Sequence, residues 1–301
     1  ACHWILPEPM PAYAREMVVT PTTPEASDAA LAFSALPAGI AREVEPLYAQ
    51  AGVKVFSNAS AYRTEADVPI LLPEVNPDHA RLVEIQRRQR GWSGYIVTNP
   101  NCTSTGMTVA LSALQQAFGL SVVFAVSLQA LSGAGYPGVP SLDILDNVIP
   151  YIGGEEEKVE WEPRKMLGRL DGEGIELADF AISAQTNRVA VSDGHIVCLT
   201  VELRERADSR RVTQALRDYQ APAASADLPS APKPVILVRD EADRPQPRLD
   251  RNTGRGMTTV VGRVRPDTVF DARMVVLSHN TVRGAAGGSI YNAELLVHQG
   301  L

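Results

Sequence analysis

Residues 94–105 read Gly94-Tyr95-Ile96-Val97-Thr98-Asn99-Pro100-Asn101-Cys102-Thr103-Ser104-Thr105, and they place a cysteine between two kinds of secondary structure. The apolar run 94–97 predicts a short buried strand. Pro100 ends it, because proline lacks an N–H and disfavours helical geometry in the residue before it. Downstream, apolar residues recur at helical spacing from Met107 to Phe118. Cys102 is therefore expected at or near the N-terminus of a helix.

This position favours a reactive thiol. The unpaired amides and the positive dipole end of a helix N-terminus stabilise a thiolate, and the same amides are placed to stabilise an oxyanion. The alternative is a small buried hydrophobe, which is what most free cysteines are. The local sequence leaves both interpretations of Cys102 open.

The first hundred residues alternate between strand-like and helix-like segments. Strands are expected at 30–34 and 53–56, and helices at 40–51 and 78–90. Strands that alternate with helices predict a parallel, doubly wound sheet. The sequence starts without Met and has no glycine before Gly39, so we expect that a strand and a glycine-rich phosphate loop precede residue 1.

From about residue 121 onward the pattern changes to long β-rich runs with few helices. It predicts an α+β domain on a large, mostly antiparallel sheet. Asp193-Gly194 predicts a hairpin turn. The last segment is expected to be a helix that packs on the first domain, with Ile290, Ala293, Glu294 and Val297 on one face. The expected strands are 121–131, 182–191, 195–203, 258–264 and 271–278, and the expected helices are 142–147, 155–167, 209–219 and 282–301.

These patterns divide the chain into two expected domains. Residues 1–102 together with 281–301 form an α/β Rossmann-like dinucleotide-binding domain that is N-terminally incomplete. Residues 103–280 form an α+β catalytic and dimerisation domain.

Composition excludes several classes of protein. The 301 residues are 45% hydrophobic and carry a net charge of −7, which is typical of a globular protein and argues against nucleic-acid binding. Three cysteines without C-x-x-C spacing favour neither disulfides nor a zinc site, and they fit a reducing cytoplasm. The longest apolar stretch, 122–131, is too short to span a bilayer, so no membrane partner is expected.

Three further groups of residues carry candidate chemistry, although each alone is weak. Gln129 precedes a small-residue turn, Ser132-Gly133-Ala134-Gly135, which would let a flat ligand approach the backbone. Glu155 and Lys158 share one helix face. Arg188 offers a fork for a carboxylate or a phosphate, and His195 suits proton transfer near neutral pH. The histidines show no metal-ligand spacing, and no metal is expected.

Taken together, these strings resemble the aspartate-β-semialdehyde dehydrogenase family, in its archaeal and fungal branch. The resemblance covers essentially the whole chain from Met17 onward. Besides 98–105, it rests on the residues 33–37, 57–63, 73–76, 132–136, 244–251 and 279–287, which read FSALP, SNASAYR, PEVN, SGAGY, RPQPRLDR and HNTVRGAAG.

The resemblance implies a catalytic set and a mechanism. Cys102 corresponds to the acylated nucleophile, His195 to the general acid/base, and Gln129 to the residue that orients the substrate carbonyl. The implied reaction is NADPH-dependent reductive dephosphorylation of L-aspartyl-4-phosphate to L-aspartate-4-semialdehyde through a Cys thioacyl intermediate. This step belongs to the biosynthesis of lysine, threonine, methionine and isoleucine.

The resemblance also implies how the substrate and NADP are bound. Arg188 corresponds to the clamp on the substrate carboxylate, Glu155 to the partner of its amino group, and Arg63 with Lys158 to the phosphate-binding pair. Asn101 is a further substrate-binding residue. The corresponding cofactor-binding residues are Ser34, Asn58, Ser132, Gly133, Ala134, Gly135 and Asn280.

Three questions stay open at this point. A malonyl-CoA reductase or another CoA-thioester reductase has the same scaffold and the same thiol chemistry, although Glu155 speaks against malonyl-CoA, which has no amino group. A non-catalytic, dimer-forming fragment without its cofactor loop is a further alternative. The sequence does not decide between NADP and NAD. The family resemblance implies a homodimer or homotetramer whose partners are the small-molecule substrate and phosphate.

Overall fold

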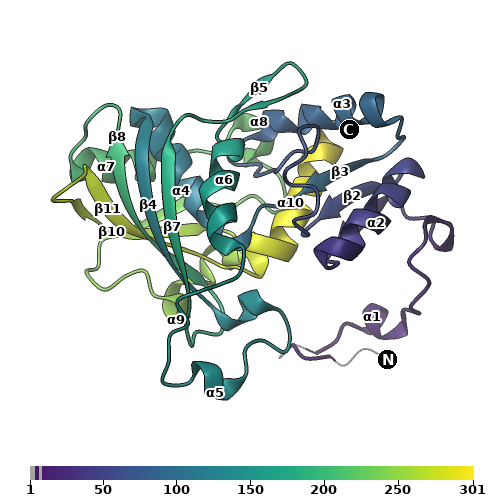
Figure 1. Ribbon diagram of the computed structural model, residues 1–301, viewed down its shortest axis with the longest axis horizontal. Helices are drawn as coiled ribbons and strands as arrows, with labels where there is room; N and C mark the ends of the chain where they lie inside the picture. Colours follow the sequence, from purple (N-terminus) through teal and green to yellow (C-terminus); the bar gives the residue numbers. More distant parts are fainter. Residues whose placement is uncertain (1–3, 7–8) are drawn as a thin grey trace.

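The computed structural model describes residues 4–6 and 9–301 and has two main sheets (Figure 1). A three-stranded parallel sheet has the order β1-β2-β3, and a six-stranded mixed sheet has the order β7-β4-β8-β11-β10-β9. A Rossmann-type sheet beside a larger mixed sheet confirms the predicted fold class. The strands are β1 (Leu31–Ser34), β2 (Lys54–Ser57), β3 (Tyr95–Thr98), β4 (Leu120–Gln129), β5 (Arg169–Asp171), β6 (Gly174–Glu176), β7 (Ala181–Arg188), β8 (His195–Leu203), β9 (Ile236–Arg239), β10 (Thr259–Pro266) and β11 (Ala272–Ser278).

Helices cover both sheets (Figure 1). Helices α2 and α3 pack on the parallel sheet. The long helix α4 lies on the six-stranded sheet and is buried along most of its length, which explains its nearly continuous apolar sequence. The α-helices are α1 (Ala12–Glu16), α2 (Ala38–Gln50), α3 (Leu82–Arg90), α4 (Cys102–Phe118), α5 (Ser141–Ile144), α6 (Glu155–Met166), α7 (Ser209–Asp218), α8 (Ala223–Ala226), α9 (Pro247–Asp250) and α10 (Gly287–His298).

Shorter helical turns complete the chain and include two segments that matter for the site. The 3-10 turn η3 follows β4, and the π-helical turn η5 leads into α10. The bounds of these turns are η1 (Pro24–Ala26), η2 (Pro77–Arg81), η3 (Leu131–Ala134), η4 (Thr253–Gly256) and η5 (Val282–Ala286).

The expected hairpin at Asp193-Gly194 is wrong. Strands β7 and β8 do not pair with each other, because both pair with β4, β7 in parallel and β8 antiparallel. Gly194 has a φ of +97°, so the turn signal was real. The local sequence of the turn does not reveal, however, that the earlier strand β4 lies between β7 and β8 in the sheet. Three of the five pairings in this sheet are antiparallel.

Helix α10 packs against β2, as expected, but of the four residues predicted to share one face only Ala293 is buried. Ile290 is 45% exposed and Val297 is 57% exposed, whereas Tyr291 is fully buried. The reason is that polar residues form part of the buried face. Ser289 donates to Asn58 Oδ1 and Asn292 donates to Asn99 Oδ1, so apolar spacing alone gave a rotated face.

A membrane span is absent from the helices of the described residues, since none combines the necessary length and apolar character.

Candidate active site

A cavity of about 650 Å³ lies where all three parallel strands end. Its walls include Ala35 after β1, Asn58 after β2 and Cys102 after β3. Ligands of doubly wound sheets bind at this carboxyl edge. The cavity gathers most of the predicted site residues, namely Asn58, Arg63, Asn101, Cys102, Gln129, Ser132, Gly133, Ala134, Gly135, Glu155, Lys158, Arg188 and Asn280.

Cys102 is the first residue of α4, as the sequence predicted. Asn101 caps this helix, because its Oδ1 accepts from the amides of Thr103 at 2.8 Å and Ser104 at 3.1 Å. These two amides already have an acceptor, so oxyanion stabilisation by the amides of this turn stays a prediction. The amide of Cys102 itself faces the Cys102 thiol.

His195 is buried behind the cavity wall and contacts the thiol. Its Nε2 lies 3.3 Å from Cys102 Sγ, and its Nδ1 accepts from the amide of Ala130 at 3.1 Å. Because Nδ1 is an acceptor, the neutral ring carries its proton on Nε2, toward the sulfur. Burial, with the charge of Arg188, lowers the pKa of His195 to about 3, so the ring is neutral at physiological pH.

Burial opposes the thiolate that the helix N-terminus favours at Cys102. Burial, together with the charge of Glu155, raises the pKa of the Cys102 thiol to about 12. Arg63 and Arg188 act in the opposite direction, and so does the Cys102 amide, but burial outweighs them. The prediction considered only the helix N-terminus and could not include the desolvation of the sulfur.

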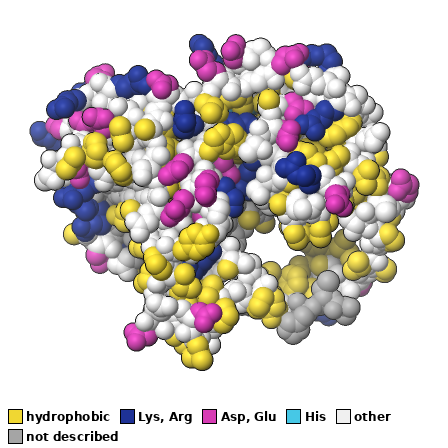
Figure 2. All heavy atoms as spheres, viewed as in Figure 1, with side chains coloured by type: hydrophobic (Ala, Val, Ile, Leu, Met, Phe, Trp, Pro, Cys, Tyr) yellow, Lys and Arg dark blue, Asp and Glu magenta, His cyan; other side chains and the backbone are white. Residues whose placement is uncertain are grey.

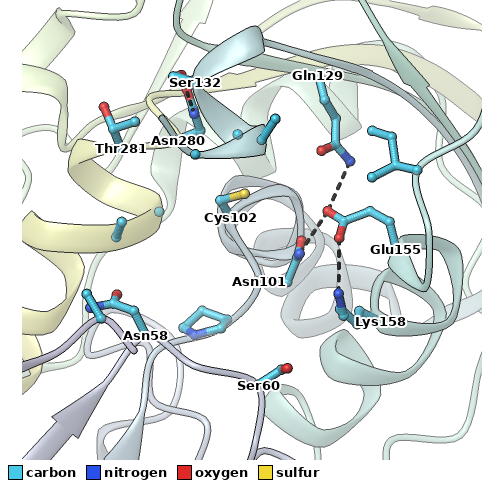
Figure 3. A pocket seen from close by; sticks show the side chains of 18 of the residues that line it. Asn58, Ser60, Asn101, Cys102, Gln129, Ser132, Glu155, Lys158, Asn280 and Thr281 are labelled. Carbon is cyan, nitrogen blue, oxygen red and sulfur yellow. Dashed lines mark hydrogen bonds and ion pairs between the residues drawn. The ribbon is translucent and has the colours of Figure 1, made fainter. Parts of the chain in front are cut away.

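Glu155 connects three of the predicted residues (Figure 3). Its Oε1 accepts from Asn101 Nδ2 at 2.8 Å and from Gln129 Nε2 at 3.1 Å, while its Oε2 pairs with Lys158 at 3.5 Å. Glu155 and Gln129 are both buried. A carboxylate in this setting needs such donors, so Glu155 fixes the positions of the side chains around the thiol.

Arg188 lies against the small-residue turn η3. Its Nη1 donates to the carbonyl of Ala130 at 2.7 Å. A Cβ atom on Gly133 would meet Arg188 Nη1 at 2.7 Å and His195 Cε1 at 2.9 Å. Gly133 is therefore required for the close approach of the turn to both functional side chains.

The predicted cofactor-binding residues line the cavity, with one exception. Asn280 donates to Ser132 Oγ at 2.8 Å (Figure 3). It also accepts from the Gly194 amide. Asn58 donates to the carbonyl of Ser34 at 3.3 Å. The side chain of Ser34 does not reach this cavity, however, and lines a neighbouring one of about 210 Å³.

Sequence reasoning missed Glu162, a buried carboxylate next to the cavity. Glu162 pairs with Arg63 Nη1 at 2.8 Å and accepts from the Asn101 amide at 2.6 Å. The available signal was its position seven residues after Glu155, on the same face of α6. Other lining residues that were not predicted are Ala35, Leu36, Pro37, Ser60, Pro100, Ile152, Thr281, Gly284 and Ala285.

Cys102 and Cys198 are free thiols, and Cys2 lies outside the described residues. Among residues 4–6 and 9–301, no group of three His, Cys, Asp or Glu side chains is arranged to hold a metal ion.

A nucleotide-type sheet edge, a cysteine–histidine pair and two buried guanidinium groups define a thiol-dependent dehydrogenase. Family models agree, since residues 5–83 match "Semialdehyde dehydrogenase, NAD binding domain" and residues 111–283 match "Semialdehyde dehydrogenase, dimerisation domain".

Individual proteins narrow the assignment. The aspartate-semialdehyde dehydrogenase of Archaeoglobus fulgidus is 51% identical over 98% of this chain and 85% of its own length. That of Schizosaccharomyces pombe is 46% identical over 100% of this chain and 87% of its own. The crystal structure of aspartate semialdehyde dehydrogenase with NADP from Candida albicans matches with a TM-score of 0.89 and 40% identity, over 99% of this chain and 86% of that chain. The chain belongs to the aspartate-semialdehyde dehydrogenase family, whose members are oxidoreductases of amino-acid biosynthesis.

Proposed function

We propose that this protein reduces L-aspartyl-4-phosphate to L-aspartate-4-semialdehyde with NADPH, through a thioester on Cys102. The observation that carries the proposal is the contact between Cys102 Sγ and His195 Nε2, at the wall of a cavity that also presents Arg63, Arg188 and Glu155. A cysteine beside an oriented histidine is an arrangement typical of covalent acyl transfer.

The charges around the cavity complement the substrate. Arg188 offers a guanidinium fork for the α-carboxylate, and Glu155 offers a carboxylate for the α-ammonium group. Arg63 and Lys158 form the positive site for the phosphate. Arg63 uses two of its five N–H groups on protein acceptors, Glu162 and the carbonyl of Asn58, and so keeps donors for an anion.

The mechanism follows from these positions. Cys102 Sγ attacks the acyl carbon and forms the thioester bond, and the acyl C–O bond to phosphate breaks. The thiol proton leaves with the phosphate, so Arg63 and Lys158 hold a hydrogen phosphate dianion. Gln129 orients the carbonyl oxygen. In the thiohemiacetal stage, His195 Nε2 lies next to the carbon on Sγ and is the atom that exchanges a proton with its oxygen. The Ala130 amide at Nδ1 leaves the ring proton on Nε2, the nitrogen beside Sγ.

The residues beside Cys102 fit a nicotinamide ring. A Cβ on Gly135 would meet no atom within 4 Å, and its backbone faces the cavity together with Ala134 and Ala285. A flat ring therefore has open access to this wall. Asn58, Asn280 and the 132–135 turn are the residues that would hold the cofactor. When bound, NADPH supplies the hydride that reduces the thioester.

NADP⁺ reduction with L-aspartate-4-semialdehyde and phosphate tests the proposal in the reverse direction. We expect phosphate-dependent turnover, and we expect Cys102→Ser to lower it by about three orders of magnitude or more. Parallel assays replace phosphate by coenzyme A and NADP⁺ by NAD⁺. Turnover that requires coenzyme A instead of phosphate would contradict the proposal and identify a thioester reductase.

We also infer that the protein works as a homodimer or homotetramer in the cytoplasm. The match of residues 111–283 to a dimerisation domain supports assembly. The lobe around α5 exposes apolar side chains, including Leu142 and Tyr151 (Figure 2). Exposed apolar patches are typical of protein interfaces. A nucleophilic thiol fits a reducing compartment. Light scattering of the purified protein and fractionation of cells test these two points.

A further inference from the structure

Glu162 lies on α6, behind the cavity wall and outside the cavity. Its side chain is 2% exposed. One carboxylate oxygen accepts from Arg63 Nη1 at 2.8 Å, and the other accepts from the backbone amide of Asn101 at 2.6 Å. A single buried carboxylate therefore joins the loop after β2 to the residue that precedes the nucleophile.

Both partners of Glu162 face the cavity themselves. Arg63 is the proposed phosphate-binding guanidinium, and Asn101 caps the helix that begins with Cys102. The ion pair fixes one edge of the Arg63 guanidinium. The bond to the Asn101 amide fixes the distance between that edge and the first turn of α4.

Lys165, one turn further along α6, holds the same loop through its backbone. Its buried ammonium group donates to the carbonyls of Arg63, Glu65 and Val68 at 2.7, 2.7 and 2.8 Å. Glu162 thus binds the side chain of Arg63, while Lys165 binds its main chain. The loop that carries Arg63 is therefore attached to α6 both through the Arg63 side chain and through its main chain.

We infer that Glu162 is a positioning residue for the phosphate group of the substrate, acting through Arg63. The inference rests on the proposed function, because it takes Arg63 as the phosphate ligand. Glu162 touches neither the substrate nor the thiol in this account. It holds the guanidinium at the correct distance from Cys102 for the leaving phosphate to be bound while the thioester forms.

The test compares Glu162→Gln with Glu157→Gln, a matched change on the exposed side of the same helix. Glutamine keeps one acceptor oxygen but removes the charge and one of the two bonds. We expect KM for phosphate to rise about ten-fold or more in Glu162→Gln, in line with other residues that orient a binding group. KM for the semialdehyde should stay within about two-fold of wild type in both variants.

Glu162→Asp covers the case in which the glutamine variant does not fold. It keeps the charge, but its side chain is one methylene shorter and cannot reach both Arg63 and Asn101. We expect an intermediate rise in KM for phosphate. A purely structural role for Glu162 would lower the active fraction, and so kcat, and leave KM for phosphate unchanged.

A folded variant at position 162 whose KM for phosphate equals that of wild type would overturn the inference. Failure of the proposed function looks different, because wild type itself would then show no phosphate-dependent turnover. Protection of Cys102 from iodoacetamide by phosphate gives a second measurement that needs no turnover. The half-protecting phosphate concentration should rise in Glu162→Gln and stay unchanged in Glu157→Gln.

Discussion

At the scale of single residues, the environment of Cys102 balances two opposing effects. Arg63 and Arg188 lower the pKa of the thiol, while burial and the negative charge of Glu155 raise it to about 12. A substrate ammonium group bound at Glu155 would neutralise the charge that raises this pKa. The nucleophile would then become more acidic only when its substrate is present.

Glu155→Gln tests this balance because it should raise the alkylation rate of Cys102 and lower the turnover of the enzyme. Removal of the carboxylate charge should lower the pKa of Cys102 and speed its alkylation by iodoacetamide several-fold at mildly alkaline pH. Turnover should fall by about ten-fold or more, since the substrate ammonium loses its charged partner. Glu157→Gln is the control and should change neither rate. Slower alkylation in Glu155→Gln would contradict the assigned effect of Glu155.

Residue types and local context revealed the cavity residues only in part. Cys102 was predictable from the strand and helix that flank it, and most of the other residues came from the family resemblance. Glu162 was not predictable, because its partners Arg63 and Asn101 lie on other elements and are distant in the sequence. The raised pKa of Cys102 likewise depends on burial that no local sequence encodes.

At the scale of elements, the π-helical turn η5 approaches α4 closely enough to require glycine. A Cβ on Gly284 would lie 2.7 Å from Cys102 Cβ and 3.0 Å from Cys102 Cα. These atoms belong to the first residue of a buried helix and cannot move freely. The position of the nucleophile therefore depends on the absence of a side chain at Gly284.

Gly284→Ala should displace Cys102 and lower kcat by about ten- to a hundred-fold, as expected for a nucleophile out of position. Overpacking should also reduce the free energy of unfolding by about 1–3 kcal/mol. Gly39→Ala is the matched control, since a Cβ on Gly39 meets nothing within 4 Å. Urea unfolding and steady-state kinetics check both variants. Wild-type kcat in Gly284→Ala would show that η5 does not constrain the thiol.

The positions of strands and helices along the chain were easier to predict than which elements pair or pack with each other. The strands β1–β3 and the helices α2 and α4 follow clear apolar patterns, and their order predicted a parallel sheet. The prediction of a hairpin at Asp193-Gly194 was wrong because the flanking strands β7 and β8 both pair with β4, which lies far earlier in the chain. The apolar pattern did not predict which face of α10 is buried, because Ser289 and Asn292 are polar and form hydrogen bonds on the buried face.

At the scale of the whole molecule, buried neutral histidines make stability depend on pH. Burial is the main cause that lowers the pKa of both His195, to about 3, and His79. The unfolded chain has ordinary histidines with a pKa near 6.5, so it binds more protons than the folded protein between these values. Stability contributed by the neutral rings is present above that ordinary value and is lost as pH falls toward about 3.

Urea unfolding at a series of pH values measures this dependence. The free energy of unfolding should fall steadily as pH drops below 6.5. His195→Asn removes one of the titrating groups and should flatten the slope, whatever its effect on catalysis. An equal slope in wild type and His195→Asn would show that His195 is not held neutral by the fold.

The division of the chain into residues 1–102 with 281–301 and residues 103–280 stays a prediction. The two sheets lie side by side (Figure 1). The cavity has walls from the ends of β1–β3, which form the smaller sheet, and from η3, α6 and η5. Helix α10 packs on β2 of the smaller sheet, which fits the prediction that residues 281–301 belong to the first domain. Hydrogen exchange that separates the two parts would test it.

Acylation of Cys102 is the central claim, and one experiment measures it directly. The protein is mixed with L-aspartyl-4-phosphate in the absence of NADPH, and both released phosphate and the protein mass are followed. We predict a burst of phosphate stoichiometric with the chain, together with an aspartyl adduct on the peptide that contains Cys102. Phosphate release without an adduct, or an adduct on another residue, would contradict the account.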